Sequence, residues 1–327
     1  MRVLVLLTLT AVLLVLMAVS VSYGSREVGL DDILAALGGS TEGFDHGAVA
    51  RRIPRTWMAV LAGAGLAVSG AVLQGVTRNP LADPGILGIT TGASLAVVIG
   101  LAWFGLASAT SYILVAIVGA AGTGAFVYVV GSLGREGATP LKLALAGAAT
   151  TAALASLVTA VVLPRPDIAE GATSWRIGGV GGATAASITT VLPFLVVGFV
   201  ICLLVAKGLN TLALGDELAA GLGERVALTR GVAALGAVVL AGAVTAVTGP
   251  IGFVGLVVPH ACRMLAGPDH RWLLPLSALG GAILLTAADV LGRVVARPEE
   301  IDVAIITAIV GAPFFIAIVR RQKVRAL

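Results

Sequence analysis

Long runs of apolar residues follow one another along the chain, separated by short segments that hold most of the charged residues. A transmembrane helix needs about 20 such residues. Ten runs cover approximately residues 3–19, 57–75, 88–107, 110–131, 141–162, 185–206, 230–248, 251–266, 272–291 and 302–319. The pattern predicts an all-α polytopic membrane helix bundle with ten transmembrane helices, built as a single domain over residues 1–327.

Two of these runs allow a second interpretation. The first, Val3 to Val19, follows Arg2 as in a secretory signal peptide. It is longer than the about 7–15 apolar residues usual in such a peptide, so we expect a retained first helix. Between residues 230 and 266, Gly249-Pro250 interrupts a stretch that is either one kinked helix or two helices joined by a tight turn. We expect two helices, because one tilted span needs fewer residues.

Composition places the chain in the membrane. Hydrophobic residues make up 58% of it, charged residues 12%, and the mean hydropathy is +1.05. Soluble domains carry about 25% charged residues, so a soluble enzyme, a disordered protein and a nucleic-acid-binding protein are excluded. The 43 glycines are about twice the usual share, as expected where membrane helices pack closely. We therefore predict a multi-pass protein of the lipid bilayer that binds no nucleic acid.

Basic residues indicate how the bundle is oriented. With ten spans, both chain ends lie on one side. Placing that side in the cytoplasm puts 13 of the 21 Lys and Arg residues inside, in the direction of the positive-inside rule. The exceptions cluster: Arg51, Arg52 and Arg55 precede the second span, and Arg293 and Arg297 follow the ninth. Such clusters on the disfavoured side indicate an acidic partner or a local ion pair.

Asp289 is an acidic residue well inside an apolar run. An intramembrane carboxylate suggests a function such as proton transfer. Arg293 follows four residues later, however, which is the spacing of an ion pair on one helix face. We expect the local pair, with a partner-facing role and proton coupling as the alternatives.

The sequence holds no motif for catalysis or metal binding. A GxxxxGK[ST] phosphate-binding loop is absent, since glycine precedes none of the three lysines. His46, His260 and His270 are far apart, and Cys202 and Cys262 lack a metal-binding spacing. The serines and threonines are scattered along apolar helices, where they commonly bond the preceding turn. We expect no catalytic residue, no metal site and no cofactor bound by this chain.

Two segments outside the apolar runs are longer than turns. Within residues 24–56, a short amphipathic helix is expected around Val28 to Leu37 on the outer surface. In residues 207–229, leucines recur at every fourth position and two acidic residues lie off that stripe: Leu214, Leu218 and Leu222, with Asp216 and Glu217. This pattern predicts two short helices on the cytoplasmic face, broken near Gly221 and Gly223.

Proline and glycine break the predicted helices at two places. In NPLADPGILG, after the second span, the backbone must turn and find partners in protein or water. A plain structural turn and a direct contact with a substrate are both open there. Spans two to five and seven to ten run in opposite orientations and each group carries a break, which is typical of a pseudo-inverted repeat. The residues concerned are Asn79, Pro80, Pro84 and Gly85, with Gly249, Pro250 and Gly252 in the second group.

Several long motifs resemble those of one transporter family. They are RRIPRTWMAVLAGAGLAVSGAVLQGVTRNPLADPGILGITTGA at 51–93, LNTLALGDELAAGLG at 209–223, TGPIGFVGLVVPHACRMLAGPDHR at 248–271, ADVLGR at 288–293 and GAPFFIAIVRR at 311–321. Over residues 50–321 the chain resembles the permease subunits of iron–siderophore, haem and cobalamin ABC importers, the type II ABC importers. It departs from them at Asp302 and Ala304, where that family usually has Pro and Gly.

The resemblance implies a function and a set of partners. It implies a permease whose cargo is an iron chelate (a ferric siderophore), haem or a corrinoid. The permease would form a dimer with a second copy of itself or with a paralogue, and the cargo would cross by alternating access at the dimer interface. Two cytoplasmic ATPase subunits, which bind ATP and Mg, and an extracytoplasmic substrate-binding protein complete the importer. It also implies a bacterial inner (cytoplasmic) membrane with both termini cytoplasmic. The alternative, an ion-coupled secondary transporter without an ATPase partner, is disfavoured by the scarcity of buried charge.

The resemblance also assigns roles by motif position. It implies that the binding protein docks on Arg52, Arg55 and Arg293. It implies an inner gate at Thr139, Pro140 and Leu141, which an ordinary helix start with proline in its first turn explains equally well. Residues 209–224 are expected to couple ATP hydrolysis to transport, with a solvated surface helix as the alternative. The coupling residues are Leu214, Gly215, Asp216, Glu217, Leu218, Gly221, Leu222, Gly223 and Glu224.

Overall fold

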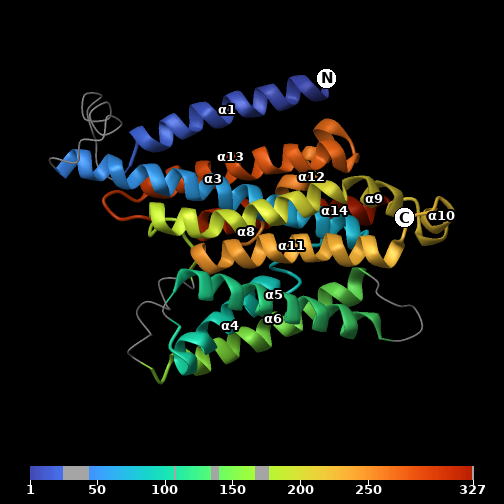
Figure 1. The fold of residues 1–327 in the computed structure, drawn as a ribbon. Coiled ribbons are helices and arrows are strands. Elements are labelled where there is room, and N and C mark those ends of the chain that lie inside the picture. The colour runs from blue at the N-terminus through green and yellow to red at the C-terminus, as the bar shows by residue number, and fades with distance from the viewer. Residues whose placement is uncertain (25–43, 107, 134–139, 166–176, 326–327) are drawn as a thin grey trace.

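The computed structural model describes residues 1–24, 44–106, 108–133, 140–165 and 177–325 (Figure 1). All regular secondary structure in these ranges is helical, so the predicted all-α class is confirmed for the described part of the chain. The helices are α1 (Arg2–Ser22), α3 (Phe44–Thr77), α4 (Ile89–Phe104), α5 (Ala109–Ser132), α6 (Pro140–Val162), α8 (Ala185–Leu204), α9 (Ala206–Leu212), α10 (Asp216–Gly221), α11 (Val226–Thr248), α12 (Val254–Ala266), α13 (His270–Val295) and α14 (Val303–Arg325).

Each predicted apolar run coincides with one of these helices, but their lengths differ. Seven helices, among the described residues, are long and apolar enough to cross a membrane. The apolar parts of the other three are shorter: Ile89–Phe104, Val254–Ala266 and Val303–Ile316. The chain is therefore a multi-pass membrane protein with seven full-length candidate spans and three shorter apolar helices.

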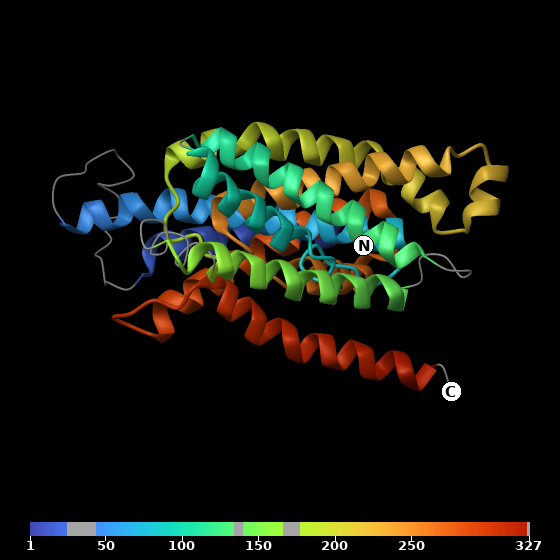
Figure 2. The same cartoon turned by 90° about the horizontal axis from the view of Figure 1, so that it is seen from below.

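Three helices form the centre of the bundle. Buried residues make up 83% of the apolar stretch of α3, 67% of that of α11 and 56% of that of α13, against 17% for α6. Helix α3 packs against both α11 and α13, and α4, α5 and α6 form a group on one side of them (Figure 1). Helix α14 lies at the edge of the bundle (Figure 2), where it packs against α12 and α13. The outer helices present apolar side chains to lipid or to another protein.

Close contact between the central helices depends on glycine. A Cβ atom on Gly63 of α3 would overlap the carbonyl group of Gly281 on α13, and a Cβ on Gly281 would overlap that of Gly63. A Cβ on Gly70 of α3 would likewise overlap the carbonyl group of Gly255 on α12. Backbone-to-backbone packing of this kind explains the glycine content read from the sequence.

Two irregular segments lie inside the bundle, at the predicted breaks. Residues 78–88 connect α3 to α4, and residues 249–253 separate α11 from α12, so the prediction of two helices around Gly249-Pro250 is confirmed. Gln74 of α3 links the first segment to the start of α12: its side-chain amide donates to the carbonyl oxygens of Ala82 (3.1 Å) and Gly255 (3.0 Å). Irregular backbone is tolerated at membrane depth only when it is surrounded by protein or water. These segments also explain why α4 and α12 are short.

The segment between α8 and α11 forms two short helices, as predicted, but the break lies elsewhere. Helices α9 and α10 are separated at Ala213–Gly215, where Gly215 has a φ of 111°, whereas we expected the break near Gly221 and Gly223. The physical reason is burial: Leu209 and Leu212 are fully buried and fix α9 to the bundle, so the chain turns directly after them. The amphipathic helix expected around residues 28–37 lies outside the described residues.

Candidate functional site

Charged residues gather at the two opposite ends of the bundle. Helix α3 runs from the end that holds Arg52 and Arg55, here called the arginine end, to the end that holds α9 and α10, here called the α10 end (Figure 1). Arg2 at the start of α1 donates to the carbonyl oxygen of Ala266, the last residue of α12, at the α10 end. The start of α1 and the end of α14 therefore lie toward the α10 end (Figure 1).

At the arginine end, the buried carboxylate of Asp289 lies between two guanidinium groups. Its Oδ2 is 2.8 Å from an amino nitrogen of Arg293, so the predicted i,i+4 pair is confirmed. Its Oδ1 is 2.8 Å from an amino nitrogen of Arg55 and 2.9 Å from Arg55 Nε. Arg55 also lies 2.6 Å from Oε2 of Glu300, in the loop before α14. Sequence reasoning missed both contacts of Arg55, because no local spacing connects α3 to residues 289 and 300.

Two arginines bind the C-terminal end of α1. Arg293 donates to the carbonyl oxygens of Ser20 (3.1 Å) and Tyr23 (3.2 Å) and to the hydroxyl of Ser20 (2.8 Å). Arg52 donates to the carbonyl oxygens of Val21 (3.2 Å) and Ser22 (2.8 Å). The last carbonyls of a helix have no partner within the helix, and these cations supply one while opposing the negative end of the helix dipole.

The three arginines expected to dock a partner are thus brought together but turned inward. Arg52 is 6% exposed and Arg293 is 1% exposed, whereas Arg55 is partly exposed. The neighbouring Arg51 is exposed. Of the expected docking residues, Arg55 is therefore the most exposed, with 13% of its side chain exposed beside the carboxylate of Glu300.

At the α10 end, Asp216 at the start of α10 makes ion pairs with two other elements. Both of its carboxylate oxygens accept from Arg230 on α11, at 2.8 Å each, and it pairs with Arg78, which directly follows α3. Glu224 accepts a hydrogen bond from Thr229 on α11. The leucine stripe is exposed: Leu214 is 57% exposed, Leu218 64% and Leu222 69%. The ion pairs of Asp216 thus hold α10 to α11 and to the end of α3, while its leucine side chains are exposed.

Helix α9 is held to the start of α13 by a polar cluster. Asn210 donates to Oδ1 of Asp269 at 2.6 Å and accepts from the backbone N–H of His270 at 2.8 Å. Asp269 caps α13 by accepting from the backbone N–H of Arg271 and also binds its side chain. The hydrogen bonds from the side chain of Arg271 hold the pKa of Asp269 well below its usual range. No spacing in the sequence connects residues 210 and 269.

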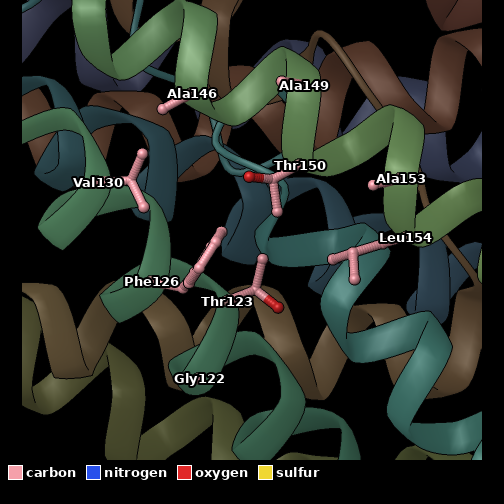
Figure 3. A pocket seen from close by; sticks show the side chains of 9 residues that line it. All are labelled: Gly122, Thr123, Phe126, Val130, Ala146, Ala149, Thr150, Ala153 and Leu154. Carbon is pink, nitrogen blue, oxygen red and sulfur yellow. The ribbon is translucent and has the colours of Figure 1, made fainter.

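Two hollows lie along α6. A cavity of about 420 Å³ is bounded by the segment after α3, the start of α12 and α6, and Asp83, which is 3% exposed, is its charged lining residue. Asp83 accepts from the backbone N–H of Gly85. A groove of about 530 Å³ between α5 and α6 is apolar except for the hydroxyls of Thr123 and Thr150 (Figure 3). Its lining residues are Gly122, Thr123, Phe126, Val130, Ala146, Ala149, Thr150, Ala153 and Leu154.

The remaining predicted residues fall at element ends. Pro140 begins α6 and Leu141, one residue later, is 69% exposed, while Thr139 lies outside the described residues. The break residues of the first group, Asn79 to Gly85, lie in the cavity segment, and those of the second lie in residues 249–252 beside it. Among the described residues, no three His, Cys, Asp or Glu side chains are grouped so that they could hold a metal ion.

A protein family matches nearly the whole chain. Residues 12–321 match the FecCD transport family. The chain belongs to this family. The family is one of transport permeases, so the chain is a transport subunit.

Relatives and a solved structure are similar to this chain over most of its length. The chain is 40% identical to the ferric enterobactin transport system permease protein FepD of Escherichia coli, over 96% of this chain and 94% of that protein. It is 39% identical to the hemin transport system permease protein HmuU of Yersinia pestis, over 83% of this chain and 82% of that protein. A metal-chelate type ABC transporter in an inward-facing conformation has the same fold, with a TM-score of 0.81 and 28% identity over 98% of this chain and 99% of that chain.

Proposed function

We propose that this chain is the permease subunit of an ATP-driven importer of the bacterial inner membrane. Its cargo class is an iron chelate, such as a ferric siderophore or ferric citrate, haem or a corrinoid. The observation that carries the proposal is the FecCD match over residues 12–321, joined to a helical framework similar to that of a metal-chelate ABC transporter. Ion-coupled secondary transport is not favoured, because the buried Asp289 is neutralised by two arginines instead of being poised to exchange a proton.

In this proposal the cargo crosses at the interface of two permease copies, or of this chain and a paralogue. Helix α6 supports that arrangement, since it borders both hollows and exposes Leu141, Leu145 and Leu157. The inner gate is proposed at Thr139, Pro140 and Leu141, of which the last two begin α6. The short helices α4, α12 and α14 complete ten spans together with the irregular segments, in a pseudo-inverted repeat whose two halves each carry one break. The two chain ends then lie in the cytoplasm, on the side of α10.

Two surfaces join the permease to its partners. At the α10 end, residues 209–224 dock in a groove of a cytoplasmic ATPase subunit that binds ATP and Mg. The exposed stripe of Leu214, Leu218 and Leu222 supports this, because an amphipathic helix docks through such a face. At the arginine end, an extracytoplasmic binding protein docks through acidic side chains around Arg52, Arg55 and Arg293, and Arg55 is the one that reaches them.

Replacement of Leu218 by Glu tests the proposed assembly. The side chain is 64% exposed, so L218E leaves the fold intact while placing a charge in the ATPase groove. We expect the affinity of the detergent-solubilised permease for the ATPase to fall at least tenfold for L218E. The matched variant L218M, which keeps an apolar side chain, retains wild-type affinity. Equal affinity of all three proteins would show that α10 is an ordinary solvated helix, and the coupling assignment would be abandoned.

A further inference from the structure

Helices α9 and α10 are attached to the bundle in different ways. Leu209 and Leu212 of α9 are fully buried, and Asn210 is bonded to Asp269 and to the backbone of His270. Helix α9 is thus part of the bundle. Helix α10 instead exposes most of its surface, and the charged contacts of Asp216 link it to α11 and to the end of α3.

The junction between the two helices permits a change of angle. Gly215 has a φ of 111°, in the left-handed region that glycine adopts without strain. A Cβ atom built on Gly215 would meet no atom within 4 Å, so the neighbouring elements do not pack against this point. A force applied to the leucine stripe of α10 therefore acts on the junction at residues 213–215 and on the ion pairs of Asp216.

One of those ion pairs connects α10 to the chain segment that lines the cavity. Arg78 directly follows α3 and has a φ of 50°, and it begins the segment 78–88 that lines the cavity through Asp83, Gly85 and Ile86. The first part of this segment is bonded to itself and to α3: the side chain of Asn79 accepts from the backbone N–H of Leu81 at 2.9 Å, and Ala82 accepts from Gln74 of α3. A displacement of Arg78 is therefore carried into the cavity wall by a short, bonded stretch of chain.

We propose that Asp216 is a positioning residue for transport, which relays movement of α10 to the cavity segment through Arg78 and to α11 through Arg230. This relay rests on the proposed function, in which an ATPase subunit moves α10. The forked pair with Arg230 fixes the direction of the Asp216 carboxylate. The side chains of Asp216 and Arg78 are 48% and 37% exposed, so their pair can form and separate within a transport cycle without unfolding the chain.

The test uses the complete importer in liposomes and measures cargo molecules taken up per ATP hydrolysed. R78Q, which lies outside the docking segment 209–224, is expected to keep the ATPase bound and hydrolysing while uptake per ATP falls at least fivefold. D216N is expected to lower the same ratio at least as far, measured in importers that have assembled with the ATPase. The double variant is expected to be no worse than D216N alone, because D216N already removes the ion pair with Arg78. D216E, which keeps the charge, is expected to restore more than half of the wild-type ratio. K207Q, which neutralises an exposed cation on α9, is the control and keeps the wild-type ratio.

Each other outcome overturns the relay. If D216N and R78Q transport as many cargo molecules per ATP as the wild type, the ion pairs transmit nothing. If D216N releases the ATPase, Asp216 is a docking residue and not a relay. If losses in D216N and R78Q add in the double variant, the two residues act separately. Failure of the proposed function looks different: the wild-type chain itself would then bind no ATPase and show no ATP-dependent uptake.

Discussion

An amino nitrogen of Arg55 lies 2.8 Å from Oδ1 of Asp289, although the two residues are 234 positions apart in the chain. Oδ2 of the same carboxylate lies 2.8 Å from Arg293. One buried carboxylate therefore compensates guanidinium groups from two helices, and Arg293 in turn binds the end of α1. The arginine end is thus held together by ion pairs within the chain. The partner that we propose to dock there would meet arginines whose positions these ion pairs already fix.

Replacing Asp289 by Asn is expected to destabilise the fold strongly. The substitution leaves the buried guanidinium group of Arg293 without its carboxylate and leaves Arg55 with Glu300 alone. Removal of one partner from a buried ion pair costs about 3–5 kcal/mol. The unfolding midpoint in detergent, followed by circular dichroism, is expected to fall by several degrees. E300Q is the control: Glu300 is exposed, so its loss is expected to cost less than about 1 kcal/mol. Equal unfolding midpoints for D289N and E300Q would contradict the claim that the ion pairs of Asp289 stabilise the arginine end.

Replacing Arg55 by Gln is expected to weaken docking of the binding protein modestly. An exposed ion pair is worth about 0.2–1 kcal/mol, so the dissociation constant is expected to rise less than tenfold at low salt, with the difference from wild type shrinking as salt is added. Surface-immobilised binding protein and solubilised permease provide the measurement. R51Q, which removes the adjacent exposed charge, is expected to bind like the wild type. If R51Q weakens binding as much as R55Q, general surface charge and not Arg55 is responsible.

Replacing Gly63 by Ala is expected to separate α3 from α13. The added Cβ would overlap the carbonyl group of Gly281, and overpacking of a core costs about 1–3 kcal/mol. The matched variant is G231A on α11, where an added Cβ meets nothing within 4 Å. Because Ala is a better helix former than Gly, G231A is expected to be neutral or slightly stabilising. Thermal unfolding of both variants in detergent checks the pair, and a G63A variant as stable as G231A would mean that the two helices are not in backbone contact.

The depressed pKa of Asp269 predicts a pH-dependent contribution to stability. An unfolded Asp has a pKa of about 3.9, so the ionised carboxylate stabilises the fold above about pH 4, and that stabilisation is lost as the pH falls below this value. D269N keeps a side chain that can cap α13 and removes only the charge. We expect the difference between the unfolding midpoints of wild type and D269N to be smaller at about pH 3 than at pH 7, because it shrinks progressively as the pH falls below about 4 toward the depressed pKa. A difference that is constant over this range would show that the charge of Asp269 contributes nothing.

Features that depend on neighbouring residues could be predicted from the sequence. The apolar runs gave the helices, because the cost of exposing backbone in lipid leaves few other structures. Gly249-Pro250 marked the break between α11 and α12, and the four-residue spacing of Asp289 and Arg293 gave their ion pair. The local rules of helix geometry suffice for each of these.

Features that depend on the packing of distant segments could not be predicted. Nothing in the spacing of Arg55 and Asp289, or of Asn210 and Asp269, shows that the bundle brings them together. The break at Gly215 was misplaced because the burial of Leu209 and Leu212 against the bundle, and not the glycine pattern, decides where α9 ends. The inward turn of Arg52 and Arg293 likewise follows from the position of the end of α1.

Uptake of a radiolabelled ferric siderophore into liposomes tests the central claim most directly. The liposomes contain this chain with its ATPase subunits, the loaded binding protein is added outside, and ATP is enclosed. An ATP-driven permease predicts uptake that requires both the ATPase subunits and ATP and that persists when ionophores remove all ion gradients. Uptake by the chain alone that an ionophore abolishes would contradict the account and establish an ion-coupled carrier.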